Sequence, residues 1–136
     1  MHYRHLNASS ECPDISALRP FKAVLIVEEA LGSDQQASIC RWLIASGCLY
    51  LMAWGLDCRS WPDAVTLANR DACESDFIPS ESLVMTTWHE NEPLRKVFWF
   101  AKHTAMHPCF ELENTVIIDL SPNEREAELA ALYESA

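Results

Sequence analysis

Short apolar runs alternate along the chain with segments that have the periodicity of helices. Four runs stand out, at residues 23–27, 48–54, 83–88 and 115–120. Each has the length of a buried strand, and a helix-start signal follows each one. Because every connection between runs contains a helix, the pattern predicts a parallel sheet covered by helices.

Capping chemistry gives the expected helix positions. Ser33 with Gln36 predicts a helix that ends at Gly47, and Ser60 with Asp63 predicts one to about residue 72. A third helix is expected over residues 94–106. The last, to about residue 134, should start at Ser121, because a proline and a glutamate follow it.

The expected fold is a three-layer α/β sandwich. Its sheet is four-stranded and mainly parallel, flavodoxin-like or Rossmann-like, with helices on both faces and an order such as 2-1-3-4. Residues 1–20, interrupted by serines and prolines, are expected to form an irregular N-terminal arm, and residues 21–136 a single α/β domain.

Composition agrees with one domain and indicates the cellular compartment in which the protein is expected. The chain has 136 residues, of which 49% are hydrophobic, enough for one core. No apolar run approaches the ~20 residues of a membrane span, and the first residues lack the apolar core of a signal peptide, so we expect a cytoplasmic protein. The six cysteines include no C-x-x-C pair and are expected to be reduced, with Cys40 and Cys48 facing the core.

Charge removes some partners from consideration. The chain has 20 Asp and Glu against 10 Lys and Arg, a formal net charge of −10. This excess argues against a nucleic-acid partner and fits a basic protein, a metal ion or solubility alone. The three glycines form no phosphate-binding loop, so no nucleotide cofactor is expected.

Polar residues follow the apolar runs, where open α/β sheets place their functional groups. They are Glu28, Glu29, Asp57, His89, Glu90 and Asp119. Such a cluster of acids can bind a hard cation or supply a general acid, and it can equally face water with no chemical role. Asp119 lies inside its strand, so it requires a buried partner.

His89 beside Glu90 has the composition of an oriented general base. Cys58 and Ser121, on neighbouring loops, are the candidate nucleophiles, although no nucleophile-elbow motif is present. A surface histidine that helps to start the next helix is the competing interpretation.

His103 and His107 are four residues apart, with Cys109 nearby. This spacing can hold zinc, but no third and fourth ligand are spaced to suit. Stabilisation of a helix carboxyl end by two histidines is the interpretation that we favour.

Tryptophan is abundant, with five residues, and three of them lie near the acids. Trp54 and Trp88 end strands, and Trp61 starts a helix at the same edge. Exposed tryptophans beside charges are typical of a protein-binding hot spot, and buried ones would belong to the margin of the core. Trp99 and Met106 are expected to face outward, which leaves a homodimer contact open.

The segments 84–90 (Val-Met-Thr-Thr-Trp-His-Glu) and 97–103 resemble a pattern found in small uncharacterised bacterial proteins, a resemblance that implies no activity. The charge, the aromatic content and the missing catalytic motifs together predict an acidic, non-enzymatic domain that binds another protein. An immunity or inhibitor protein that masks a basic partner is one concrete form. The alternative is a small hydrolase or metal-dependent enzyme with its site at the carboxyl ends of the strands.

Overall fold

Five strands form one parallel sheet in the order β1-β5-β2-β3-β4. The computed structural model describes residues 1–7, 11–75 and 77–136. Residues 8–10, which belong to the expected arm, and Asp76 lie outside the described residues. The strands are β1 (His2–Leu6), β2 (Phe21–Val27), β3 (Cys48–Gly55), β4 (Met85–His89) and β5 (Asn114–Leu120). The helices are α1 (Ser33–Ser46), α2 (Trp61–Cys73), α3 (Leu94–His103) and α4 (Glu126–Ser135), with short 3₁₀ turns η1 (Ser16–Leu18), η2 (Cys58–Ser60) and η3 (Ser80–Ser82).

The expected parallel α/β architecture is confirmed, with one strand more than the sequence predicted. The additional strand, β1, lies in the segment that was expected to be an irregular arm. It runs beside β5, with Tyr3 opposite Ile117 and His5 opposite Asp119. Polar residues within this edge strand prevent a continuous apolar run, which is why the pattern of buried strands did not include it.

The strand order places a topological switch point between β2 and β5. The chain steps outward from β2 to β3 and β4, and then returns to add β5 on the other side of β2. This doubly wound arrangement is of the flavodoxin-like class. Numbered in chain order, the four expected strands lie in the order 3-2-1-4, so the expected order 2-1-3-4 is wrong in detail.

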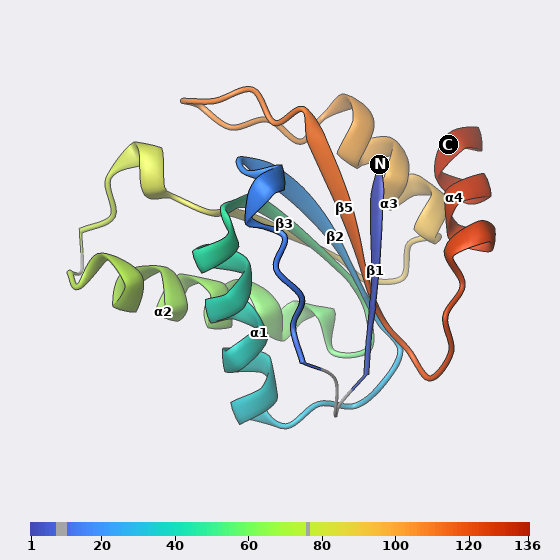
Figure 1. Ribbon diagram of the computed structural model, residues 1–136, viewed down its shortest axis with the longest axis horizontal. Coiled ribbons are helices and arrows are strands. Elements are labelled where there is room, and N and C mark those ends of the chain that lie inside the picture. The colour runs from blue at the N-terminus through green and yellow to red at the C-terminus, as the bar shows by residue number, and fades with distance from the viewer. Residues whose placement is uncertain (8–10, 76) are drawn as a thin grey trace.

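Helices cover both faces of the sheet, as predicted. Figure 1 shows α1 and α2 on one face and α3 and α4 on the other. Alternate residues of the central strand supply the two cores: Leu25 packs in the cluster under α1 and α2, and Ile26 in the cluster under α3 and α4. The buried central strands therefore leave the strand ends and the sheet edges as the places where polar chemistry can lie.

Several helix boundaries differ from the sequence prediction because other hydrogen bonds take the capping groups. α1 starts one residue earlier than its predicted cap allows, and the Gly32 N–H donates to Gln35 Oε1 at 3.0 Å. α4 starts at Glu126 instead of following Ser121, whose hydroxyl donates to the Asn123 carbonyl at 2.9 Å. Leu67 on α2 is 61% exposed, although an apolar residue between Ala64 and Ala68 on this helix would be expected to face inward.

Gly55 joins the ends of β2 and β3 closely. Its φ of +105° is in the left-handed region, and a Cβ there would lie 2.2 Å from the Val27 carbonyl oxygen. That carbonyl accepts a hydrogen bond from the Leu56 N–H at 2.8 Å. Glycine at this position therefore fixes how the loop after β3 leaves the sheet next to the residues that follow β2.

Among the described residues, none of the helices combines the length and the apolar character that a membrane crossing requires.

Candidate functional site

The carboxyl ends of β2, β3 and β4 lie side by side, so the acids that follow these strands share one edge of the molecule. We define the acidic rim as Glu28, Glu29, Asp57, Glu90 and Glu92. All are exposed except the half-buried Glu29. Two arginines form ion pairs with the rim: Arg59 with Glu90 at 2.9 Å and Arg125 with Glu28 at 3.0 Å. Five carboxylates and two paired guanidinium groups leave the rim negative.

Asp119, expected to need a buried partner, has more than one. Its side chain is fully buried near the end of β5. Arg125 donates to both carboxylate oxygens, at 2.7 and 3.2 Å, and the Tyr3 hydroxyl donates to Oδ2 at 2.6 Å. The same Tyr3 oxygen accepts the Arg125 backbone N–H at 2.9 Å. This network joins β1, β5 and the start of α4, which is a structural task for each of its members.

The electrostatics of the network favour charged Asp119. Burial alone would raise the pKa of the Asp119 carboxyl, but hydrogen bonds from Arg125, Tyr3 and Ser121 outweigh burial and lower it. The hydrogen bond to Asp119 in turn raises the pKa of Arg125 above its ordinary value. Both charges therefore persist across the physiological range, and Asp119 has no free proton to transfer.

The structure does not bring the expected catalytic residues together. Asp119 and His89 are on strands separated by β2 and β3, which corresponds to about 14 Å across the sheet. The Cys58 thiol contacts the His89 backbone but packs in the core cluster under α1 and α2. The His89 ring lies on the opposite face, edge-on against Phe100 of α3, with ring centroids 5.0 Å apart. Ser121 lies beside β1, where its carbonyl bonds the His5 ring.

Cys58 also lacks the environment of a reactive thiol. It is 2% exposed, and burial raises the pKa of its thiol. A raised pKa keeps the sulfur protonated and poorly nucleophilic. All six cysteines are unpaired, and Cys40 and Cys48 are buried as predicted.

His89 is held at both ring nitrogens. Its Nδ1 lies 2.8 Å from Glu92 Oε2, and its Nε2 lies 2.9 Å from Thr87 Oγ1. A carboxylate can only accept, so Nδ1 carries a proton, and in the neutral ring Nε2 accepts the Thr87 hydroxyl proton. Glu92, not the adjacent and expected Glu90, is therefore the carboxylate that orients this histidine.

A groove of about 770 Å³ lies between β4 and α3. Its walls come from the edge of β4, the turn after it and the first two turns of α3. The residues that line it include Thr87, Trp88, Glu92, Lys96, Trp99 and Phe100. We call this feature the β4 groove. It combines aromatic surface with charged groups of both signs, which is a composition suited to binding.

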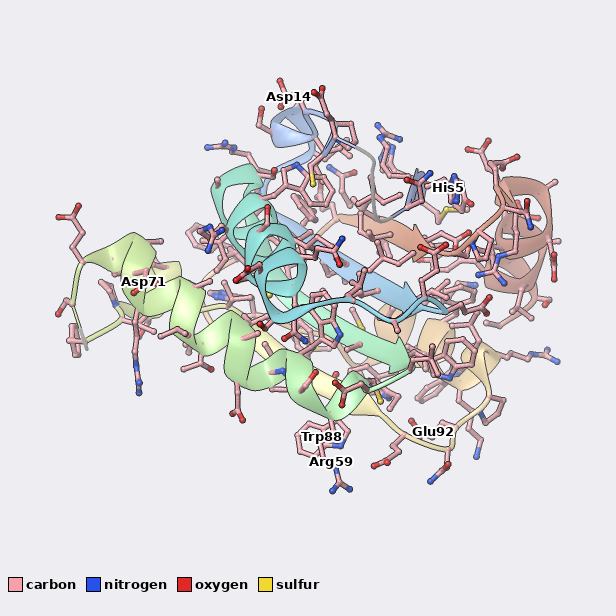
Figure 2. The ribbon with its side chains drawn as sticks, turned by 90° about the horizontal axis from the view of Figure 1, so that it is seen from below. His5, Asp14, Arg59, Asp71, Trp88 and Glu92 are labelled. Atoms are coloured by element: carbon pink, nitrogen blue, oxygen red, sulfur yellow. The ribbon has the colours of Figure 1, made fainter. Side chains whose placement is uncertain are left out.

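The tryptophans near the rim have three different situations. Trp61 is 2% exposed and belongs to the core, so the expectation that it contributes to a binding surface is wrong. Trp54 is half-buried, and its Nε1 donates to the Glu92 carbonyl at 2.6 Å, which fixes the turn after β4. Trp88 and Trp99 are 48% and 53% exposed. In Figure 2, Trp88, Arg59 and Glu92 project from the same side of the molecule.

The sequence placed His103 and His107 at the carboxyl end of one helix. α3 ends at His103, so His103 and His107 do not share a helix face, which corrects that expectation. His107 uses both ring nitrogens: Nε2 bonds the Leu83 carbonyl at 2.8 Å, and Nδ1 accepts the Cys109 N–H at 3.1 Å. Within the described ranges, no group of three or more His, Cys, Asp or Glu side chains is arranged to hold a metal ion.

Sequence reasoning missed several of these residues. Thr87 and His89 are two residues apart on a strand. Side chains two residues apart point to the same face of a strand, so the sequence could have indicated their contact. Glu92, three residues after His89, was within reach along the same turn. The contact of Arg125 with Asp119 had no sequence signal, because it depends on where α4 begins.

The family model described as "Domain of unknown function (DUF7684)" matches residues 1–136, so the chain belongs to this family. No curated protein and no solved structure matches the chain.

Proposed function

We propose that this DUF7684 member is a protein-binding domain that captures a basic partner through the acidic rim and the β4 groove. An immunity or inhibitor protein that masks a basic region of its partner is the concrete form that we favour. The observation that carries the proposal is the pair of half-exposed tryptophans, Trp88 and Trp99, beside the rim carboxylates. Aromatic side chains, tryptophan above all, are enriched at protein-binding interfaces and at their hot spots.

Charge supports a basic partner in particular. The whole chain carries a net charge of −10, and the rim keeps three carboxylates without an arginine partner: Glu29, Asp57 and Glu92. Opposite charges across an interface accelerate capture and fix its orientation, and salt screens them. The buried Asp119 network, by contrast, supports the position of Arg125 and needs no ligand.

The first experiment compares partner capture by the tagged wild-type chain and by a rim variant. The variant carries Glu28→Gln, Asp57→Asn and Glu90→Gln. We expect the partner to be reduced by at least about tenfold at low salt, because the variant removes three charges from the binding surface. Quantitative mass spectrometry measures the amount of captured partner at low and at moderate salt.

The matched control carries Glu74→Gln, Glu111→Gln and Glu113→Gln. These exposed acids lie before β4 and β5, at the opposite end of the sheet, and their substitution makes the same change in net charge. Equal loss in both variants would mean that net charge alone acts, and undiminished capture by the rim variant would refute the proposed surface.

A second function, hydrolysis of a small ester, is favoured by one observation. The series Thr87, His89 and Glu92 has the contacts of a nucleophile, its base and the carboxylate that orients the base. His89 would accept the hydroxyl proton as Thr87 Oγ1 attacks the ester carbonyl, and would give it to the alcohol that leaves. Water, deprotonated in turn by His89, would then hydrolyse the acyl-threonine, which releases the acid and restores the Thr87 hydroxyl. The hydroxyl of Thr87 also contacts the Tyr50 phenol, which competes with this role.

Hydrolysis of p-nitrophenyl acetate separates the two functions. If the hydrolase function holds, Thr87→Val should lower the enzyme-dependent rate by at least about a hundredfold, since it removes the nucleophile and little volume. Thr86→Val, on the other face of β4, is the control and should leave the rate unchanged. A wild-type rate equal to that of Thr87→Val would exclude this function.

A further inference from the structure

We infer that the partner contributes an extended basic segment, which pairs with the free edge of β4 as a sixth strand and places side chains in the β4 groove. This inference rests on the proposed function and specifies the shape and the chemistry of what the surface binds. Three observations carry it: the unequal protection of the two sheet edges, the side-chain surroundings of β4, and the charges at its ends.

The two edges of the sheet are protected differently. β1 carries His2, Arg4 and His5, and Arg4 Nη1 donates to its neighbour's carbonyl at 2.8 Å. Charged side chains on an edge strand oppose further strand pairing. β4, with the sequence Met-Thr-Thr-Trp-His, has no Lys, Arg, Asp, Glu or Pro. Over the described ranges, β3 is the one strand that pairs with β4, and no loop backbone covers its other edge.

The side chains of β4 offer contacts to an added strand on both faces of the sheet. Thr86 and Trp88 lie opposite residues of the core under α1 and α2, whereas Thr87 and His89 lie opposite residues of the core under α3 and α4. A sixth strand would therefore place alternate side chains on the face of Thr86 and Trp88 and on the face of Thr87 and His89, and the β4 groove along this edge is lined from both faces, by Trp88 and by Thr87. Backbone pairing would supply affinity and the groove would supply selectivity, which is the usual division in β-strand addition.

The charges around β4 select a basic segment over a second copy of this chain. Glu81 in η3 precedes the strand and Glu90 follows it. Antiparallel pairing of two β4 strands would bring the Glu81 end of one copy toward the Glu90 end of the other, with a net charge of −10 on each chain. A segment with Lys or Arg would instead meet Glu92, which has no arginine partner, and the exposed Glu90, which it would share with Arg59, and its cations could lie over the exposed tryptophan rings.

The test uses a synthetic peptide, acetyl-Thr-Lys-Val-Arg-Thr-Lys-Val-amide, and two N-methylated forms of it. One form is methylated on the backbone amides of the two Lys and the Arg. The other is methylated on the backbone amides of the two Val and the second Thr. Successive amides of a strand point to opposite edges, so one form blocks pairing with β4 and the other leaves it intact. We expect one form to bind at least about tenfold more weakly than the parent and the other to bind equally.

Nitrogen-15 NMR of the full chain measures affinity and location together. The inference predicts shifts and slowed amide exchange at Met85–His89, and no binding of the matched peptide with Glu in place of each basic residue. Equal binding of both methylated forms, shifts confined to β1, or no binding of the parent at millimolar concentration would overturn it. If both forms bind and the shifts lie at Glu28 and Asp57, strand addition fails while the acidic rim stands as the binding surface, and the capture experiment tests that surface separately.

Discussion

Asp119→Ala should lower the free energy of unfolding by about 3 kcal/mol. The variant leaves the Arg125 guanidinium and the Tyr3 hydroxyl without the carboxylate that both of them contact. Removing one member of a buried ion pair costs about 3–5 kcal/mol. We expect the lower end of that range, because the Arg125 side chain is 21% exposed and keeps its ion pair with Glu28.

Urea denaturation followed by tryptophan fluorescence measures this change. Asp71→Ala is the control, since Asp71 is exposed near the end of α2, and it should change the free energy of unfolding by less than about 0.5 kcal/mol. A loss of less than about 1 kcal/mol for Asp119→Ala would show that the network does not join β1, β5 and α4 as described.

The same network predicts an acid dependence of stability. The folded state lowers the pKa of Asp119 below its ordinary value near 3.8, so the unfolded chain binds more protons as the pH falls. The stabilisation is therefore complete at pH values well above 3.8 and is lost as the pH falls from there through the lower pKa of the folded state. Asp119→Asn should show a shallower loss of stability over this window than the wild type.

Trp88→Ala should weaken partner binding by at least about 2 kcal/mol, or about thirtyfold, while leaving the fold intact. The side chain is 48% exposed beside the rim and the β4 groove, so its truncation removes partner contact more than core packing. Titration calorimetry with the captured and purified partner measures the affinity, and circular dichroism measures the melting temperature of each variant.

Phe77→Ala is the matched control for Trp88→Ala. Phe77 is 76% exposed in the loop that leads to η3, before β4 begins, so it offers a similar aromatic truncation away from the rim. It should bind with wild-type affinity. Equal losses for the two variants, or full affinity for Trp88→Ala, would contradict the assignment of Trp88 as an anchor.

The sequence predicted the parts of the fold that depend on local pattern. Continuous apolar runs identified β2, β3, β4 and β5, and Gly47 was correctly placed at the left-handed end of α1, with φ of +102°. Burial of β2 and β5 between two helical layers explains why those runs are continuous. β1 was missed because an edge strand between polar residues has no such run.

The site was predictable in position and less so in its partners. That the acids would follow β2, β3 and β4 came from fold class alone, and their exposure at one edge agrees with that expectation. The contacts of Asp119 with Tyr3 and Arg125 could not be predicted, because Tyr3 is 116 residues away along the chain. Trp61 was a candidate for the binding surface because it starts a helix at the same edge as the acids, but it fills the core beneath α1 and α2.

Hydrogen–deuterium exchange of the chain with and without its purified partner tests the central claim most directly. The account predicts that binding slows exchange in β4, in the turn through Glu92 and at the start of α3, with a smaller effect after β2 and β3. Slowed exchange confined to β1, α4 or the loops that precede the strands would contradict it, because the partner would then occupy a different surface.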